Sequence, residues 1–195
     1  MEHIFAVKNQ EELALYQAFL QDARPRLEAY IRFLQAEYRA EELPRCIVWS
    51  DPDIAVHLVS DIPVPAYTND FRVMFTPDLK AWREIYLRQL DGSPESETVR
   101  RLRDYYAGRL STNHVLKILG HELAHHSALF VDDFDEYPSP STWFEEGMVE
   151  YISRKWFLTP EEFAGEEDVN HQLTALLADR YGGHPLEDFG SHLRD

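Results

Sequence analysis

The five residues His-Glu-Leu-Ala-His at 121–125 are the strongest chemical signal in the sequence. Side chains four residues apart lie on one face of an α-helix, so His121 and His125 are spaced to hold one metal ion. Glu122 lies about 100° around the helix from His121, because a turn takes about 3.6 residues. That position suits a base that acts on a metal-bound water. The motif therefore predicts a zinc site with His121 and His125 as ligands and Glu122 as the catalytic general base.

The residues around this motif favour a helix at about 112–130, because they are largely apolar and strongly helix-forming. Three polar residues are suited to cap its start: Ser111, Thr112 and Asn113. Small side chains recur on it at helical spacing and would let a second helix approach closely: Gly120, Ala124 and Ser127. The alternative is a buried helix whose histidines only hydrogen-bond within the core. Two histidines and a glutamate in one turn disfavour this alternative, because each would have to be desolvated and satisfied.

A catalytic zinc ion normally takes three protein ligands and a water, so the third ligand must come from another element. The helix expected at about 142–157 offers Glu145, Glu146 and Glu150. Thr142 and Glu145 have the spacing of a capping box, which assigns Glu145 to the helix start. Glu146 points about 100° away and is free to bind metal. Glu150 is placed to accept a hydrogen bond from the outer ring nitrogen of a ligand histidine. Without the histidine motif, these glutamates would be interpreted as a solvated acidic helix face.

The motif HELAH, followed by W-F-E-E-G-M-V-E-Y at 143–151, resembles the gluzincin group of zinc metallopeptidases. The similarity is to the M1 aminopeptidase-like, or peptidase MA-like, pattern and covers about residues 112–156. In that pattern the glutamate ligand directly precedes a glycine, which implies Glu146. The spacing from His125 is slightly longer than in the family and Glu145 would bring it nearer, so Glu145 stays the alternative ligand. A Gly-Ala-Met-Glu-Asn exopeptidase motif is missing upstream, so the resemblance implies no aminopeptidase activity.

The resemblance also implies a zincin-like fold, in which a twisted sheet packs on the helix that carries the motif. An edge strand of that sheet lines the cleft, and Phe71–Phe75 is the expected edge strand, with which an extended peptide would pair. The family further uses a tyrosine or histidine to stabilise the oxyanion. No motif selects this residue, and its candidates are Tyr137, Tyr151, His126, His184 and Tyr181.

The N-terminal part is predicted to be helical, because apolar residues recur every three or four positions from Leu13 to Tyr38. Pro25 is expected to divide this segment into two helices or to kink it, and Pro44 to end it. Three short segments rich in β-branched or aromatic residues are predicted strands: Cys46–Trp49, Ile54–Val59 and Phe71–Phe75. Residues 60–70 are predicted to form a loop, because the segment contains two prolines.

The remainder of the chain is predicted to be helical apart from its connections. Helices are expected at about 78–90, 95–109, 112–130 and 142–157, with a loop at 131–141. Thr159-Pro160 is expected to begin the last helix and Gly182-Gly183 to end it. These elements predict an α+β fold in a single domain over residues 1–195. It combines a small twisted sheet, an active-site HExxH helix and a helical C-terminal half.

Composition and charge exclude several classes of partner. The net charge of −16 repels phosphate backbones and anionic lipid surfaces, so we expect neither nucleic acid nor a membrane as partner. The single cysteine, Cys46, cannot form an internal disulfide. The sequence shows no secretory signal and no apolar run of the ~20 residues that span a bilayer, so a cytoplasmic location is expected. The sequence specifies no oligomeric state.

These observations favour a zinc-dependent hydrolase, a peptidase in which Glu122 takes a proton from water and returns it to the leaving amine. Its substrate would be a peptide or protein, extended and rich in Lys or Arg near the scissile bond, since the acidic chain attracts cationic segments. The main alternative is a zincin-fold protein that binds metal without turnover and serves in regulation or as a scaffold. The retained base Glu122 argues against it, and the short chain argues for it. A third alternative is a coincidental motif in a helical interaction domain.

Overall fold

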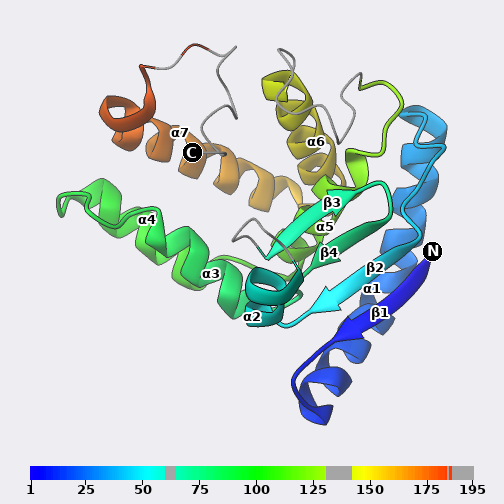
Figure 1. Cartoon of the computed structure of the whole chain (residues 1–195). Coiled ribbons are helices and arrows are strands. Elements are labelled where there is room, and N and C mark those ends of the chain that lie inside the picture. Colours follow the sequence, from blue (N-terminus) through cyan, green and yellow to red (C-terminus); the bar gives the residue numbers. More distant parts are fainter. Residues whose placement is uncertain (60–64, 131–141, 184, 186–195) are drawn as a thin grey trace.

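The computed structural model describes residues 1–59, 65–130, 142–183 and 185, so the loop expected at 131–141 lies outside the described residues. The predicted α+β class is confirmed: the described residues form a mixed sheet of four strands, and 64% of the described structure is helical (Figure 1). The strand order is β1-β2-β4-β3. The strands are β1 (Glu2–Ala6), β2 (Cys46–Ser50), β3 (Ala66–Asn69) and β4 (Arg72–Phe75). Strands β1, β2 and β4 are parallel, and β3 is antiparallel to β4.

The two faces of the sheet are covered differently. One face presents Ile47, Trp49, Val73 and Phe75, which pack into the main core together with apolar side chains of α1 and α5. The opposite face presents Val48 and Met74 to a much smaller cluster around Ala55. Because side chains alternate between the faces of a strand, this register places the long helices on one side of the sheet. The helix that carries the histidine motif lies among them (Figure 1).

Helix α1 (Gln10–Glu37) is continuous through Pro25, so the predicted division of the segment into two helices is wrong. Proline removes the bond that would reach the carbonyl of Gln21. Both residues are exposed, so water can hydrate that carbonyl. The buried face of the helix holds it against the core through Tyr16, Leu20, Ala23, Leu27, Tyr30 and Leu34.

Two strand assignments need correction. Ile54–Val59 is not a strand but a helical turn, α2 (Pro52–Ile54), followed by a short π-helix, η1 (Ala55–Val59). Asp51 accepts hydrogen bonds from the first amides of α2, and Pro52 occupies its first position, both signals of a helix start. The predicted strand at Phe71–Phe75 exists as β4, but it pairs on both sides and is not an edge. The edge beside it is β3, which lies in the segment expected to be a loop.

The helices predicted from residue 78 onward are present. They are α3 (Leu79–Arg88), α4 (Glu97–Gly108), α5 (Thr112–Ala124), α6 (Thr142–Phe157) and α7 (Pro160–Tyr181). Side chains cap four of them at the N-terminus: Asp78, Ser96, Ser111 and Thr159. Helix α5 ends earlier than expected, at the motif itself. No helix in the described part of the chain is long and apolar enough to cross a membrane.

Helices α5 and α6 pack closely because Gly120 has no side chain. A Cβ atom at this position would lie 2.5 Å from the Phe157 ring and 3.3 Å from the Cβ atom of Ser153. The Tyr30 hydroxyl donates a hydrogen bond to the Gly120 carbonyl at 2.9 Å, which joins α1 to the same junction. The expected close approach of a second helix at Gly120 is therefore confirmed, and it brings the two chemistry-bearing helices face to face.

Candidate metal centre

The structure brings together the three side chains expected to bind metal. The Nε2 atoms of His121 and His125 lie 3.2 Å apart. The carboxylate of Glu146 on α6 lies 3.3 Å from Nε2 of His121 and 3.7 Å from Nε2 of His125. One donor atom from each of the three residues lies within 4.8 Å of the others. Two neighbouring helices thus direct two imidazole nitrogens and one carboxylate at a common point.

The other ring nitrogen of each histidine is occupied by an outer carboxylate. Nδ1 of His121 donates a hydrogen bond to Glu150 Oε2 at 3.0 Å, as the sequence predicts. Nδ1 of His125 donates one to Glu145 Oε1 at 2.7 Å. A proton held on Nδ1 leaves the lone pair of Nε2 free, and hydrogen bonding to a carboxylate makes that nitrogen a stronger metal ligand. With the proton on Nδ1, both histidines would offer Nε2 to a metal ion, and the outer carboxylates favour that tautomer once a metal replaces the second proton.

Glu145 has a role that its spacing from Thr142 does not predict. Its Oε1 atom accepts a hydrogen bond from Nδ1 of His125, and the side chain thereby orients that ring. The side chain is buried, and its Oε2 atom has no hydrogen-bond partner among the described residues. Glu145 also faces the Nδ1 side of His125, whereas Glu146 faces the Nε2 atoms of both histidines. This geometry favours Glu146 over Glu145 as the third ligand.

Glu122 lies beside the two histidines without being tied to them. It is partly buried and forms no hydrogen bond or ion pair with another described residue. Burial raises the pKa of Glu122, the positive histidines lower it, and the carboxylates of Glu146 and Glu150 raise it further. The net direction is upward. A carboxylate that is free of partners and easier to protonate than usual suits a group that takes up and returns a proton.

The electrostatic surroundings favour positive charge at this point of the molecule. Burial lowers the pKa of His121, but hydrogen bonds to Glu146 and Glu150 outweigh it and raise the pKa to about 10. Burial raises the pKa of Glu146, but its contact with His121 and the charge of His125 hold the pKa below its ordinary value. Protons and metal cations are stabilised by the same anionic groups. The arrangement therefore suits a divalent cation.

The expected candidates for oxyanion stabilisation receive little support. His126 is buried, and its Nε2 atom lies 2.7 Å from the Thr68 hydroxyl, so the ring joins the end of α5 to β3. Burial lowers the pKa of His126 to about 4, which keeps it neutral. Tyr151 is half exposed, with Lys155 above its ring. Tyr137, His184 and the side chain of Tyr181 lie outside the described residues.

Two cationic side chains near the centre were missed in the sequence. Lys117 Nζ lies 3.5 Å from Glu150 Oε1, and Arg154 forms an ion pair with the same oxygen. Lys117 is only 3% exposed. The sequence contained one signal for Lys117. It lies one turn before His121 on the apolar face of α5, where a buried lysine needs a charged partner.

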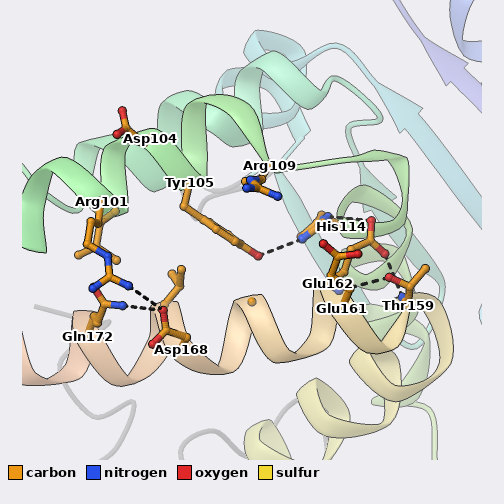
Figure 2. Close-up of a pocket in the computed structure, with 13 residues that line it drawn as sticks. Arg101, Asp104, Tyr105, Arg109, His114, Thr159, Glu161, Glu162, Asp168 and Gln172 are labelled. Carbon is orange, nitrogen blue, oxygen red and sulfur yellow. Dashed lines mark hydrogen bonds and ion pairs between the residues drawn. The ribbon is translucent and has the colours of Figure 1, made fainter.

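A separate cavity of about 630 Å³ lies between α4 and α7 (Figure 2). The hydroxyl of Tyr105 reaches across it to within 3.4 Å of Nε2 of His114, whose Nδ1 atom accepts a hydrogen bond from the Ser111 amide. Asp168 on its rim is bonded by Gln172 and paired with Arg101. The three candidate metal ligands do not line this cavity. Its polar side chains mainly hold α4, α5 and α7 together.

The chain matches no protein-family model, no curated protein and no solved structure. The chemistry of the site is therefore judged from its donor set. Two imidazole nitrogens and one carboxylate are the protein ligands of one common type of catalytic zinc site, in which a further position stays open. The placement of the three donors and the carboxylates beside both Nδ1 atoms fit that requirement.

Proposed function

We propose that the protein is a zinc-dependent hydrolase of the gluzincin type, a peptidase with a zincin-like fold. One observation carries the proposal. The Nε2 atoms of His121 and His125 and the carboxylate of Glu146 face one another, while both Nδ1 atoms are bonded to outer carboxylates. A pair of histidines that served only in packing would not need three carboxylates arranged around the two imidazoles.

In this proposal, His121, His125 and Glu146 hold the metal ion. Bound zinc would supply Lewis acidity, which polarises a carbonyl group and makes water a stronger acid. Glu122 accepts the proton of the attacking water and returns it to the leaving amine. Glu145 and Glu150 keep the two histidines in the tautomer that binds metal.

The position of β3 supports a polypeptide substrate. This strand lies at the edge of the sheet, and Thr68 within it contacts His126 directly after the last proposed histidine ligand. An extended peptide could pair with the backbone of such an edge, which provides affinity without a particular sequence. The proposed substrate-binding strand is therefore β3, and no longer the interior strand at Phe71–Phe75.

Metal analysis and a turnover assay with Glu122→Gln as control test this proposal. We expect about one zinc per chain in the purified protein and in the variant, since the substitution is nearly isosteric and leaves the ligands in place. Only the unaltered protein should cleave an unfolded polypeptide, and a chelator should stop it. Zinc binding without cleavage would support the non-catalytic metal-binding alternative. A protein that takes up no metal would refute both and leave the motif as a coincidence.

A further inference from the structure

The outer carboxylate Glu150 belongs to a larger group of charged side chains. Its Oε2 atom accepts the hydrogen bond from His121, and its Oε1 atom faces Lys117 and Arg154. Both cations also contact Glu166 of α7. Lys117 Nζ lies 2.8 Å from its carboxylate, and Arg154 Nε lies 2.9 Å from it. Two acids and two bases, the Glu150–Lys117–Arg154–Glu166 ring, thus connect α5, α6 and α7.

Two members of this ring are more deeply buried than the other two. The side chains of Glu166 and Lys117 are 8% and 4% exposed. The side chains of Glu150 and Arg154 keep 33% and 24% exposure. A buried charge is tolerated only with a compensating partner, so Glu166 is needed where water cannot take its place. Without the Glu166 carboxylate, Lys117 and Arg154 would both have to pair with Glu150, the other carboxylate of the ring.

We propose that Glu166 is a positioning residue for the metal centre and acts on His121 through Lys117, Arg154 and Glu150. This inference rests on the proposed zinc site. By sharing both cations, Glu166 prevents them from drawing the Glu150 carboxylate away from His121. The Oε2 atom of Glu150 then stays directed at Nδ1, which keeps the His121 ring in its orientation and its Nε2 lone pair toward the metal position. Helix α7, which supplies no metal ligand of its own, thereby sets the zinc affinity.

The test is the zinc affinity of Glu166→Gln, measured by competition with a chelating indicator. The substitution keeps the shape of the side chain and removes its charge. Loss of an outer-shell partner costs about 10- to 100-fold in metal affinity, and for a residue one contact further away we expect about three- to tenfold. The control is Glu167→Gln, the neighbouring exposed glutamate of α7, which removes the same charge outside the ring and should leave the affinity unchanged. Unfolding temperatures of the metal-free proteins verify that each variant folds.

A double-mutant cycle with Glu150→Gln separates positioning from a general structural or charge effect. If Glu166 acts through Glu150, adding Glu166→Gln to Glu150→Gln should cause little further loss of affinity. Equal losses in both backgrounds would overturn the inference, as would wild-type affinity in a folded Glu166→Gln protein. If Glu166→Gln does not fold, Glu166→Asp tests the same connection. Its shorter side chain should also weaken zinc binding, and wild-type affinity in that variant would refute the role.

The experiment distinguishes a failure of the proposed role of Glu166 from a failure of the proposed metal site. If the unaltered protein binds no zinc, the metal site itself is refuted and the inference falls with it. If the unaltered protein binds zinc and Glu166→Gln binds it equally tightly, the metal site stands and only the role of Glu166 is refuted.

Discussion

The two kinds of carboxylate at the candidate metal centre have separable effects. Glu146 faces the Nε2 atoms of both histidines, whereas Glu145 and Glu150 each hold one Nδ1 atom. A ligand that contacts the ion directly contributes much more to affinity than a group that only orients another ligand. Substitutions at neighbouring positions on α6 can therefore distinguish the ligand from the orienting residue.

We expect Glu146→Ala to lose zinc during purification, because it removes one of three ligands. Glu145→Ala should retain zinc with about 10- to 100-fold weaker affinity, because it removes only the partner of His125. Metal content and a chelator competition assay measure both effects. If Glu145→Ala strips the ion while Glu146→Ala keeps it, the ligand assignment is wrong.

Helical periodicity explains which site residues the sequence could predict. His121, His125, Glu146 and Glu150 lie where their spacing placed them, because side chains about one turn apart share a face. The role of Glu145 could not be predicted. Its spacing from Thr142 fits a capping box equally well, and the rotation of α6 about its own axis decides which partner it meets. That rotation depends on the packing against α5.

At the scale of elements, the α5–α6 junction determines whether the site can form. Its closest point is Gly120, where the Phe157 ring occupies the space of a side chain. The histidine nitrogens at the end of α5 and the glutamate carboxylates of α6 lie close to this contact. A small increase in the separation of these helices would lengthen every contact of the centre.

We expect Gly120→Ala to destabilise the metal-free protein by up to about 2 kcal/mol. Overpacking against Phe157 costs about 1–3 kcal/mol, and the higher helix propensity of alanine offsets about 1 kcal/mol of it. Chemical denaturation measures the difference. The matched control is Gly147→Ala on α6, where an added Cβ meets no atom within 4 Å and stability should rise by about 0.5–1 kcal/mol. A stabilised Gly120→Ala protein would contradict the close packing described here.

The start of α7 is tied to the start of α5 by Glu162. Its carboxylate accepts hydrogen bonds from the Ser111 hydroxyl at 2.6 Å, the Asn113 amide at 2.7 Å and the Thr159 backbone at 2.9 Å. Burial raises the pKa of Glu162, but these hydrogen bonds outweigh it and lower the pKa to about 2. A carboxyl group whose pKa is lower in the folded state stabilises the fold above its ordinary pKa, and this contribution is lost as the pH falls.

Glu162→Gln should therefore lower the free energy of unfolding at pH 7 by about 1–3 kcal/mol, as expected for hydrogen bonds to a charged group. The difference from the unaltered protein should be complete above the ordinary pKa and shrink as the pH falls from 4.5 toward about 2. Urea titrations at several pH values measure it. Glu161→Gln, in the same turn but exposed, should show no such difference. A difference that does not vary with pH would exclude this role of the charge.

Most helices of the C-terminal half were predictable, because caps and apolar periodicity agree there. The errors lie where two local signals compete. Residues 54–59 have strand-forming side chains, but the preceding Asp51-Pro52 begins a helix. β1 and β3 are no shorter than β2 and β4, respectively, but they lie at the edges of the sheet, and pairing with β2 and β4 defines them. Pro25 is tolerated because it lies on the solvent side of α1.

At the scale of the whole molecule, the net charge of −16 should affect which polypeptides reach the proposed active site. An acidic protein attracts cationic segments over distances of about a Debye length, which is about 10 Å at 0.1 M salt. β3 is an edge strand of the sheet that the described residues form, and backbone pairing with such a strand would accept any extended sequence. Charge and edge together favour extended, basic substrates.

If the protein cleaves peptides, those with Lys or Arg near the scissile bond should be cut faster than acidic ones at low salt. The preference should decline as the ionic strength rises, because salt screens the attraction. A digest of matched basic, neutral and acidic peptides at two salt concentrations measures it. Equal cleavage of acidic and basic peptides at low salt would exclude the electrostatic contribution.

The proposed ligands and their orienting carboxylates all come from two consecutive helices, between residues 121 and 150. A cross-link between nearby positions closes a short loop, so it costs little chain entropy and needs few distant contacts. Zinc would therefore stabilise the α5–α6 pair first and the strands only through it. During unfolding, the helix pair would act as a late-surviving unit, while β1, which pairs with β2 across 44 residues of chain (Glu2 with Cys46), would separate earlier.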